Sequence, residues 1–158
     1  MISVWRISFC TSPLPTESAL LQSQGLGSTL YEGRWHSKTG MPIAYCSSSH
    51  ALCQLEKRVH AGGRAVKGQI LMRLDLPKSA TLDDVAKVGL PADWRTDVAA
   101  TRRIGDGWLS GNSSLGLWVP SAVEPLERKL LLNPAHSQYV HIRLTVERDP
   151  FVFDPRLF

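Results

Sequence analysis

The sequence predicts a single α+β domain that spans residues 1–158. A chain of 158 residues and 17.5 kDa suits one hydrophobic core, and its 43% of hydrophobic residues are enough to fill that core. Segments with the apolar alternation of strands lie between segments with the periodicity of helices. No repeat, low-complexity tract or linker divides the chain, so we expect mixed secondary structure around one core.

The first half of the chain predicts three strands and one helix. Alternating apolar residues indicate strands at 3–8 and 42–47, and a longer apolar run indicates a buried strand at 68–77. The segment between the first two strands is polar and rich in proline and glycine, as connecting segments are. Residues 49–60 predict a helix, because serines at 47–49 offer N-caps and Ala-Gly-Gly at 61–63 ends it.

The second half of the chain predicts alternating helices and strands. The expected elements, in chain order, are helical turns at 81–85 and 90–94, a helix at 97–109 interrupted near Gly105 and Gly107, a strand at 115–123 that leaves through Pro120, a helix at 124–133 capped by Asn133-Pro134, and a strand or hairpin at 139–154 interrupted at Pro150.

Hydropathy and cysteine content argue against a membrane or secreted protein. The chain has no run of 18 apolar residues, and Arg6 interrupts the apolar N-terminal stretch, so neither a membrane span nor a secretory signal is expected. Cys10, Cys46 and Cys53 are odd in number and lack C-x-x-C spacing, which predicts reduced thiols. We therefore expect a cytoplasmic protein without membrane contact.

The net charge of +4 and pI near 9.2 indicate an anionic partner. Much of the excess lies in residues 57–73, which makes nucleic acid one candidate. Glycines separate these charges, however, and no RNP or zinc-finger pattern accompanies them. A solvated loop explains the stretch better, so direct nucleic-acid binding is not predicted.

Glu56 is the most informative anomaly of the predicted 49–60 helix. Leu52, Leu55 and Val59 form an apolar i, i+3, i+7 stripe whose i+4 position is Glu56, so a carboxylate is expected on the core face. An ionised carboxylate is costly to bury without a partner. Glu56 therefore either pairs with a Lys or Arg or lines a cavity, and the sequence leaves both readings open.

Arg34 lies in the segment "YEGRWHSKTG" between a glycine and a tryptophan. Gly33 allows a close approach to the backbone and Trp35 offers an apolar wall, a setting that suits an anion site. The alternative is that Trp35 belongs to the core and Arg34 is a strand residue that faces water.

Two other groups of residues permit chemistry without requiring it. His50 and Cys53 lie one helical turn apart and could be a base and thiol or two metal ligands, with Cys46 and His60 as distant additions. The lack of a third group at suitable spacing favours a buried thiol and an exposed imidazole, so no metal is predicted. Ser121 follows a proline at a strand exit, where a hydroxyl commonly supports a turn or a cap.

Several motifs considered together resemble the RES-domain family, the toxin partners in Xre-RES toxin–antitoxin pairs. The family is named for an Arg, a Glu and a Ser, which match Arg34, Glu56 and Ser121. The resemblance covers essentially the whole chain in family order. The motifs that carry it are "GRW" at 33–35, "AYCSSSHALCQLE" at 44–56, "VPSAV" at 119–123, "NPAH" at 133–136 and "DPRLF" at 154–158.

The resemblance also implies further site residues. Tyr45 matches an active-site tyrosine, His36 stands where many members have Asn, and "CSSS" at 46–49 replaces a commoner Thr-bearing segment. His36 and Tyr45 are therefore expected at the binding site together with the Arg, Glu and Ser. His136 of "NPAH" is expected to be structural, with phosphate orientation as its alternative.

What the resemblance implies is a mixed-sheet fold like that of ADP-ribosyltransferases, with a cleft for NAD as substrate and an activity that cleaves its nicotinamide–ribose bond. Arg34 would then hold the pyrophosphate and Tyr45 would stack on nicotinamide or ribose. Glu56 would oppose the developing positive charge on the ribose. Ser121 would bind the nicotinamide carboxamide or fix Glu56, and the sequence does not choose between these two roles.

The expected protein is thus an NAD-degrading toxin that uses water or inorganic phosphate as acceptor. Its expected partner is a cognate Xre-type antitoxin, whose helix-turn-helix region would contact DNA while another part covers the cleft. One alternative is protein ADP-ribosylation, which differs only in the nucleophile. Another is a non-catalytic module that binds nucleic acid or an acidic protein.

Overall fold

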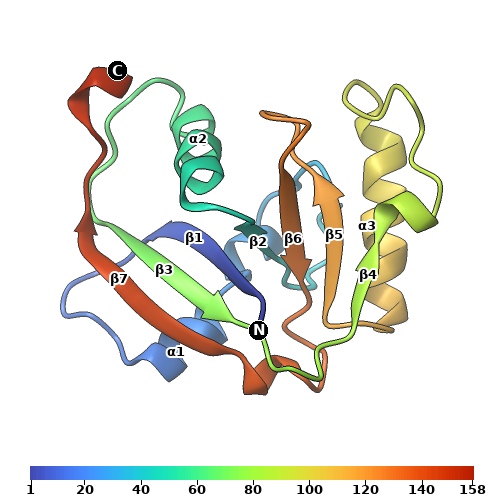
Figure 1. Ribbon diagram of the computed structural model, residues 1–158, viewed down its shortest axis with the longest axis horizontal. Helices are drawn as coiled ribbons and strands as arrows, with labels where there is room; N and C mark the ends of the chain where they lie inside the picture. The colour runs from blue at the N-terminus through green and yellow to red at the C-terminus, as the bar shows by residue number, and fades with distance from the viewer.

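The computed structural model describes residues 1–158 and contains seven strands and three α-helices (Figure 1). The strands are β1 (Ser3–Phe9), β2 (Ala44–Ser47), β3 (Gln69–Asp75), β4 (Leu82–Asp84), β5 (Gly116–Pro120), β6 (Arg128–Leu132) and β7 (Arg143–Phe151). The helices are α1 (Glu17–Ser23), α2 (His50–His60) and α3 (Val98–Gly111), and short 3₁₀ turns lie at Leu26–Thr29, Val85–Lys87, Tyr139–His141 and Pro155–Leu157.

The strands form one mixed sheet in the order β4-β5-β6-β2-β1-β3-β7, in which only β4 and β5 are parallel. The predicted α+β class with a mixed sheet core is confirmed. β1 pairs with β3 along seven residues but touches β2 at the single position Trp5–Ser47. The sheet therefore divides into two halves, β4-β5-β6-β2 and β1-β3-β7, which diverge in Figure 1.

Apolar side chains cover both faces of the sheet. Strand β6 illustrates the alternation, since Leu130 and Leu132 join the largest core cluster with α1 while Leu131 joins a second cluster with α3. A third, smaller cluster combines Ile7 of β1 with Cys53 of α2 and Phe151 of β7. The position of each helix over the sheet is thus set by burial of apolar surface.

Helix α2 begins and ends where its sequence predicts. The Ser49 hydroxyl accepts a hydrogen bond from the Leu52 amide at 3.1 Å, which caps the first turn. Beyond the last turn, Gly62 and Gly63 have φ of +59° and +81°, a conformation that favours glycine. The predicted start and stop signals of this helix are both confirmed.

Helix α3 is continuous, so the predicted interruption near Gly105 and Gly107 is wrong. Asp97 caps its start by accepting from the Ala100 amide at 2.9 Å. A Cβ at Gly105 would overlap the backbone carbonyl of Trp35, so this glycine is needed for the close approach of α3 to the segment beside Arg34. Gly105 is a packing residue and does not break the helix.

Other secondary-structure predictions are also corrected. Residues 124–133 were expected to form a helix but contain central strand β6, and 81–85 contains β4, followed by a 3₁₀ turn, in place of a helical turn. The helical turn expected at 90–94 is present as hydrogen-bonded turns at 92–96, where the Trp94 amide donates to the Pro91 carbonyl at 3.1 Å, whereas helix α1 was not predicted. β7 is one strand that continues through Pro150 to Phe151 at an edge of the sheet, where proline is tolerated. None of the helices is both long and apolar enough to cross a membrane.

Candidate active site

A cavity of about 510 Å³ lies where the two halves of the sheet diverge, with α2 as one wall. Residues of β1, β2, β6 and α2 line it, together with Ile43, Pro120 at the end of β5, Ala122, Val123 and residues of the connecting segment 27–36. Four of the predicted site residues, Arg34, His36, Tyr45 and Glu56, are among them. Ser121 lies behind the wall in contact with Glu56. The structure therefore brings together segments that are far apart in the sequence.

The face that α2 presents to the cavity differs from the predicted stripe. Cys53, Glu56, Lys57 and His60 all line the cavity and follow the i, i+3, i+4, i+7 spacing of one helix face. Leu55, which was expected in the core, is 44% exposed. The expectation for Glu56 is confirmed, because it is only 8% exposed, but its neighbours on that face are mostly polar.

Both predicted environments of Glu56 occur at once, since it lines the cavity and is paired. Oε1 accepts a hydrogen bond from Ser121 Oγ at 2.8 Å, and Oε2 accepts from Lys129 Nζ at 2.9 Å. His60 Nε2 lies farther away, at 3.6 Å from Oε2. Every close partner of the carboxylate is a donor.

The charge state of Glu56 follows from these partners. Burial opposes ionisation, but His60, the charge and hydrogen bond of Lys129 and the hydrogen bond of Ser121 outweigh it and lower the pKa of Glu56 to about 2. The His60 contact exceeds ordinary hydrogen-bond length, so we assign most of the stabilisation to Lys129 and Ser121. Glu56 is therefore an anion at neutral pH.

Ser121 is fully buried and its hydroxyl is fully engaged. It donates to Glu56 and accepts from the amides of Val123 and Glu124, each at 3.1 Å. No second proton is left for a ligand. Of the two roles left open by the sequence, the geometry favours holding Glu56 in place.

Lys129 is the site residue that sequence reasoning missed. It lies on β6, where it pairs in register with Ser47 of β2, and it is only 9% exposed. Its ammonium also lies 5.1 Å from the centre of the Tyr45 ring, a cation–π distance. The predicted helix at 124–133 hid this position, because a central strand and a helix direct the same residue differently.

The Tyr45 hydroxyl belongs to a closed hydrogen-bond chain. His36 Nε2 faces the carbonyl oxygens of Tyr31 and Ser28 at 2.8 and 3.1 Å, and carbonyls only accept, so Nε2 carries the proton. His36 Nδ1 is then the acceptor for the Tyr45 hydroxyl at 2.6 Å. The hydroxyl in turn accepts from the Trp35 amide at 3.2 Å. Burial raises the pKa of Tyr45, which therefore stays neutral.

Gly33 is explained by the same chain. A Cβ there would lie 2.7 to 2.9 Å from the His36 ring and the Tyr45 oxygen. The close approach expected at this glycine is therefore made by side chains of the protein itself. Gly33 keeps His36 and Tyr45 packed beneath the segment that carries Arg34.

Arg34 lines the cavity and retains free donors. Its Nη1 donates to the carbonyls of Arg95 at 2.8 Å and Trp94 at 3.4 Å, while Nε and Nη2 make no hydrogen bond within the protein. No carboxylate pairs with it. Trp35 is 1% exposed, so the expected core role of Trp35 is confirmed, whereas Arg34 lies in a bend and not in a strand.

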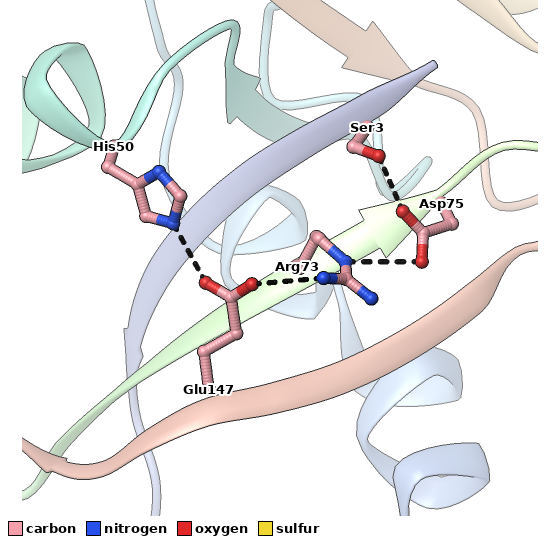
Figure 2. Close-up of polar contacts among 5 residues, drawn as sticks. All are labelled: Ser3, His50, Arg73, Asp75 and Glu147. Atoms are coloured by element: carbon pink, nitrogen blue, oxygen red, sulfur yellow. Dashed lines mark hydrogen bonds and ion pairs between the residues drawn. The ribbon is translucent and has the colours of Figure 1, made fainter. Parts of the chain in front are cut away.

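His50 and Cys53 do not form a reactive pair. His50 Nε2 contacts Glu147 at 2.9 Å, and Glu147 also pairs with Arg73, so the imidazole ends a polar chain on the β1-β3-β7 half of the sheet (Figure 2). The His50 side chain is 51% exposed and Cys53 is 4% exposed. The exposed imidazole and buried thiol expected from the sequence are confirmed.

The remaining candidates lie outside the cavity. His136 sits in the turn after β6, where its Nδ1 accepts from the Gln138 amide at 3.2 Å, in keeping with a structural role. No three His, Cys, Asp or Glu side chains are grouped in a way that could hold a metal ion. The absence of a metal remains a prediction.

Comparison with known proteins gives a consistent picture. The family model described as RES domain matches residues 3–154. A Toxin Res of Photorhabdus laumondii is 36% identical over 147 residues, covering 90% of this chain and 93% of that protein. A Toxin Res of Yersinia enterocolitica is 38% identical over 136 residues, covering 84% and 88% of the two chains.

Two further proteins are informative. A Prs ADP-ribosylating toxin of a Sphingobium species is 34% identical over 161 residues, with 98% of this chain and 96% of that protein covered. A chain of the crystal structure of the M. tuberculosis MbcT–MbcA toxin–antitoxin complex superimposes with a TM-score of 0.66 at 17% identity, over 90% of this chain and 80% of that chain. That likeness supports the fold. The family match along nearly the whole chain, together with these identities, shows that the chain belongs to the RES domain family.

Proposed function

We propose that this chain is the toxin of a toxin–antitoxin pair and that it degrades NAD by cleaving the nicotinamide–ribose bond, with water or inorganic phosphate as acceptor. The observation that carries the proposal is an anionic Glu56 held on the wall of a cavity that also contains an unpaired Arg34. Relatives named as toxins support it.

The size and charge of the cavity support a dinucleotide substrate. Its volume of about 510 Å³ lies within the range of roughly 300–1,000 Å³ that is usual for ligand sites. Arg34 has two guanidinium nitrogens without protein partners, and a planar guanidinium recognises phosphate oxygens in a bidentate manner. Arg34 would therefore hold the pyrophosphate of the substrate.

NAD supplies a ribose bonded to a cationic leaving group, so little acid catalysis is needed and positive charge develops on the sugar as the bond breaks. Glu56 would oppose that charge and accept a hydrogen bond from a ribose hydroxyl. Ser121 fixes one carboxylate oxygen, and Lys129 keeps the buried group ionised before substrate arrives. Tyr45 would contribute its ring, because its hydroxyl is already engaged by His36.

A second candidate function is ADP-ribosylation of a protein target. The name of the Sphingobium relative, which describes an ADP-ribosylating toxin, favours it. The same carboxylate and arginine would serve this reaction, since bond cleavage is shared and only the nucleophile differs.

The partner would be an antitoxin that covers the cavity near Arg34 and carries a helix-turn-helix DNA-binding region of the Xre type. The superimposed M. tuberculosis chain belongs to a toxin–antitoxin complex, which supports an antitoxin partner. DNA contact would then belong to the partner and not to this chain.

Purified protein incubated with NAD tests the proposal. We expect release of nicotinamide, together with ADP-ribose when water is the acceptor or a phosphorylated ADP-ribose when inorganic phosphate is added. Transfer of radiolabel from NAD to a protein in cell extract would instead establish the second candidate. Intact NAD under all three conditions would leave only the non-catalytic binding module.

A further inference from the structure

We propose that Arg6 and Lys57 form a second phosphate-group subsite in the cavity, distinct from Arg34; the assignment of its ligand rests on the proposed function. Both residues line the cavity, and neither takes part in an ion pair. The carboxylate closest in sequence, Glu56, is already neutralised by Lys129 at 2.9 Å. Two cations that line one cavity therefore lack a counter-ion.

Arg6 is incompletely satisfied by the protein. It projects from β1, and its Nη1 donates to the Tyr45 carbonyl at 2.7 Å. Its Nε is buried without any hydrogen-bond partner, and Nη2 makes no hydrogen bond within the protein. A partly buried guanidinium without a carboxylate is costly, and that cost falls when an anion enters the cavity.

Lys57 lines the same cavity from helix α2. It belongs to the cavity-facing side of α2, is partly buried and makes no hydrogen bond through its ammonium. Burial lowers the pKa of Lys57, and the nearby positive charge of Arg6 lowers it further. Like charges brought together at a cavity repel each other unless an anion lies between them.

The chemistry of the two groups favours a phosphate group as that anion. A guanidinium offers paired donors to two phosphate oxygens, and an ammonium adds a point charge that any oxygen can accept. Trp5 also lines the cavity, and its buried Nε1 is a further donor without a partner. The phosphate group comes either from the dinucleotide or from free inorganic phosphate.

Anion binding to the full chain tests the subsite without requiring turnover. Isothermal titration would use pyrophosphate and orthophosphate on the wild type, Lys57→Gln and Lys67→Gln. Lys67 is exposed, does not line the cavity and has no ion pair, so its variant removes the same charge elsewhere. We expect Lys57→Gln to weaken binding about tenfold or more, on the scale of one charge-assisted hydrogen bond. Lys67→Gln should leave it unchanged.

Two further measurements complete the design. Lys57→Arg keeps the charge and should retain binding, which guards against a folding artefact in Lys57→Gln. Orthophosphate should raise the apparent KM for NAD if the subsite holds a phosphate of the dinucleotide, and should leave it unchanged if the subsite holds free phosphate. Equal anion affinities for Lys57→Gln and Lys67→Gln would overturn the subsite even if NAD is cleaved. Anion binding that depends on Lys57 in a protein inert toward NAD would instead overturn only the proposed function.

Discussion

Glu56 is a carboxylate that the folded chain keeps ionised by surrounding it with donors. Ser121 follows strand β5 and Lys129 lies on β6, both more than sixty positions from Glu56 in the sequence. Each of them binds one oxygen of the Glu56 carboxylate. Such a group raises stability only while it remains charged. Its effect on folding is therefore tied to pH.

The pH dependence of stability provides a first prediction. The folded pKa of about 2 lies below the ordinary value of 4.5, so the unfolded chain takes up a proton first as the pH falls. The stabilisation from Glu56 should be complete above about pH 4.5 and lost as the pH falls towards about 2. Denaturant unfolding from pH 6 to pH 2.5 measures it, and Glu56→Gln should show a shallower dependence. The same pH dependence of the unfolding free energy in wild type and Glu56→Gln would contradict this environment for Glu56.

Arg34→Lys provides a second prediction. Lysine keeps the charge but loses the paired donors, so the apparent KM for NAD should rise with a smaller loss in kcat. Steady-state kinetics check it, with Lys38→Gln as a control because Lys38 is exposed and lies outside the cavity. An unchanged KM in Arg34→Lys would remove Arg34 from substrate binding.

Single residues were predictable from the sequence to different degrees. Glu56 was recognisable because a carboxylate interrupts an apolar stripe, although Leu55 turned out to be exposed. Arg34, Tyr45 and His36 were found through the family motifs. Lys129 carries no local signal, because a lysine becomes a partner of Glu56 only when β6 lies beside β2.

At the scale of elements, helix caps and turns could be predicted from the sequence, whereas the buried leucines of β6 led to the wrong prediction of a helix. The run at 130–132 suits a helix by propensity, and a short apolar run does not distinguish helix from buried strand. The segment forms a strand because it pairs with β5 on one side and with β2 on the other. The missed helix α1 did carry a sequence signal, because Thr16 is a residue type that caps helices. In the structure its hydroxyl accepts a hydrogen bond from the Ala19 amide at 3.2 Å.

Helix α3 yields a third prediction, which uses its two glycines as a matched pair. Gly105→Ala places a methyl group against the Trp35 carbonyl, so it should cost about 1–3 kcal/mol of stability, as overpacking does, and lower activity by moving Arg34. A Cβ at Gly107 meets nothing within 4 Å, so Gly107→Ala should stabilise the protein by roughly 0.5–1 kcal/mol. Denaturant unfolding measures both. Equal effects would contradict the close packing described here.

At the scale of the whole molecule, the site exists because the sheet divides. Strands β1 and β2 pair at one position only, so a space is left where they diverge. Helix α2, the segment at 27–36 and β6 direct side chains into this space. No local pattern predicts where two strands separate. The sequence motifs indicated which residues belong together, and the topology explains how they meet.

The partner gives a fourth prediction. Expression of this chain alone in bacteria should deplete NAD and arrest growth, and co-expression of the proposed cognate antitoxin should relieve both effects. Growth curves and cellular NAD assays measure this, with Glu56→Gln as the inactive control. Normal growth and normal NAD at high levels of the lone chain would contradict a toxin that acts on NAD.

The central claim is that Glu56 promotes cleavage of the nicotinamide–ribose bond, and nicotinamide release by purified wild type and Glu56→Gln tests it most directly. Glutamine nearly keeps the volume but removes the charge, so we expect a rate at least about a hundredfold lower per folded molecule with little change in NAD affinity. A thermal unfolding curve of each protein confirms that equal folded amounts are compared. A Glu56→Gln protein with a lower Tm but wild-type release per folded molecule would contradict the account, because Glu56 would then serve only as a structural ion pair.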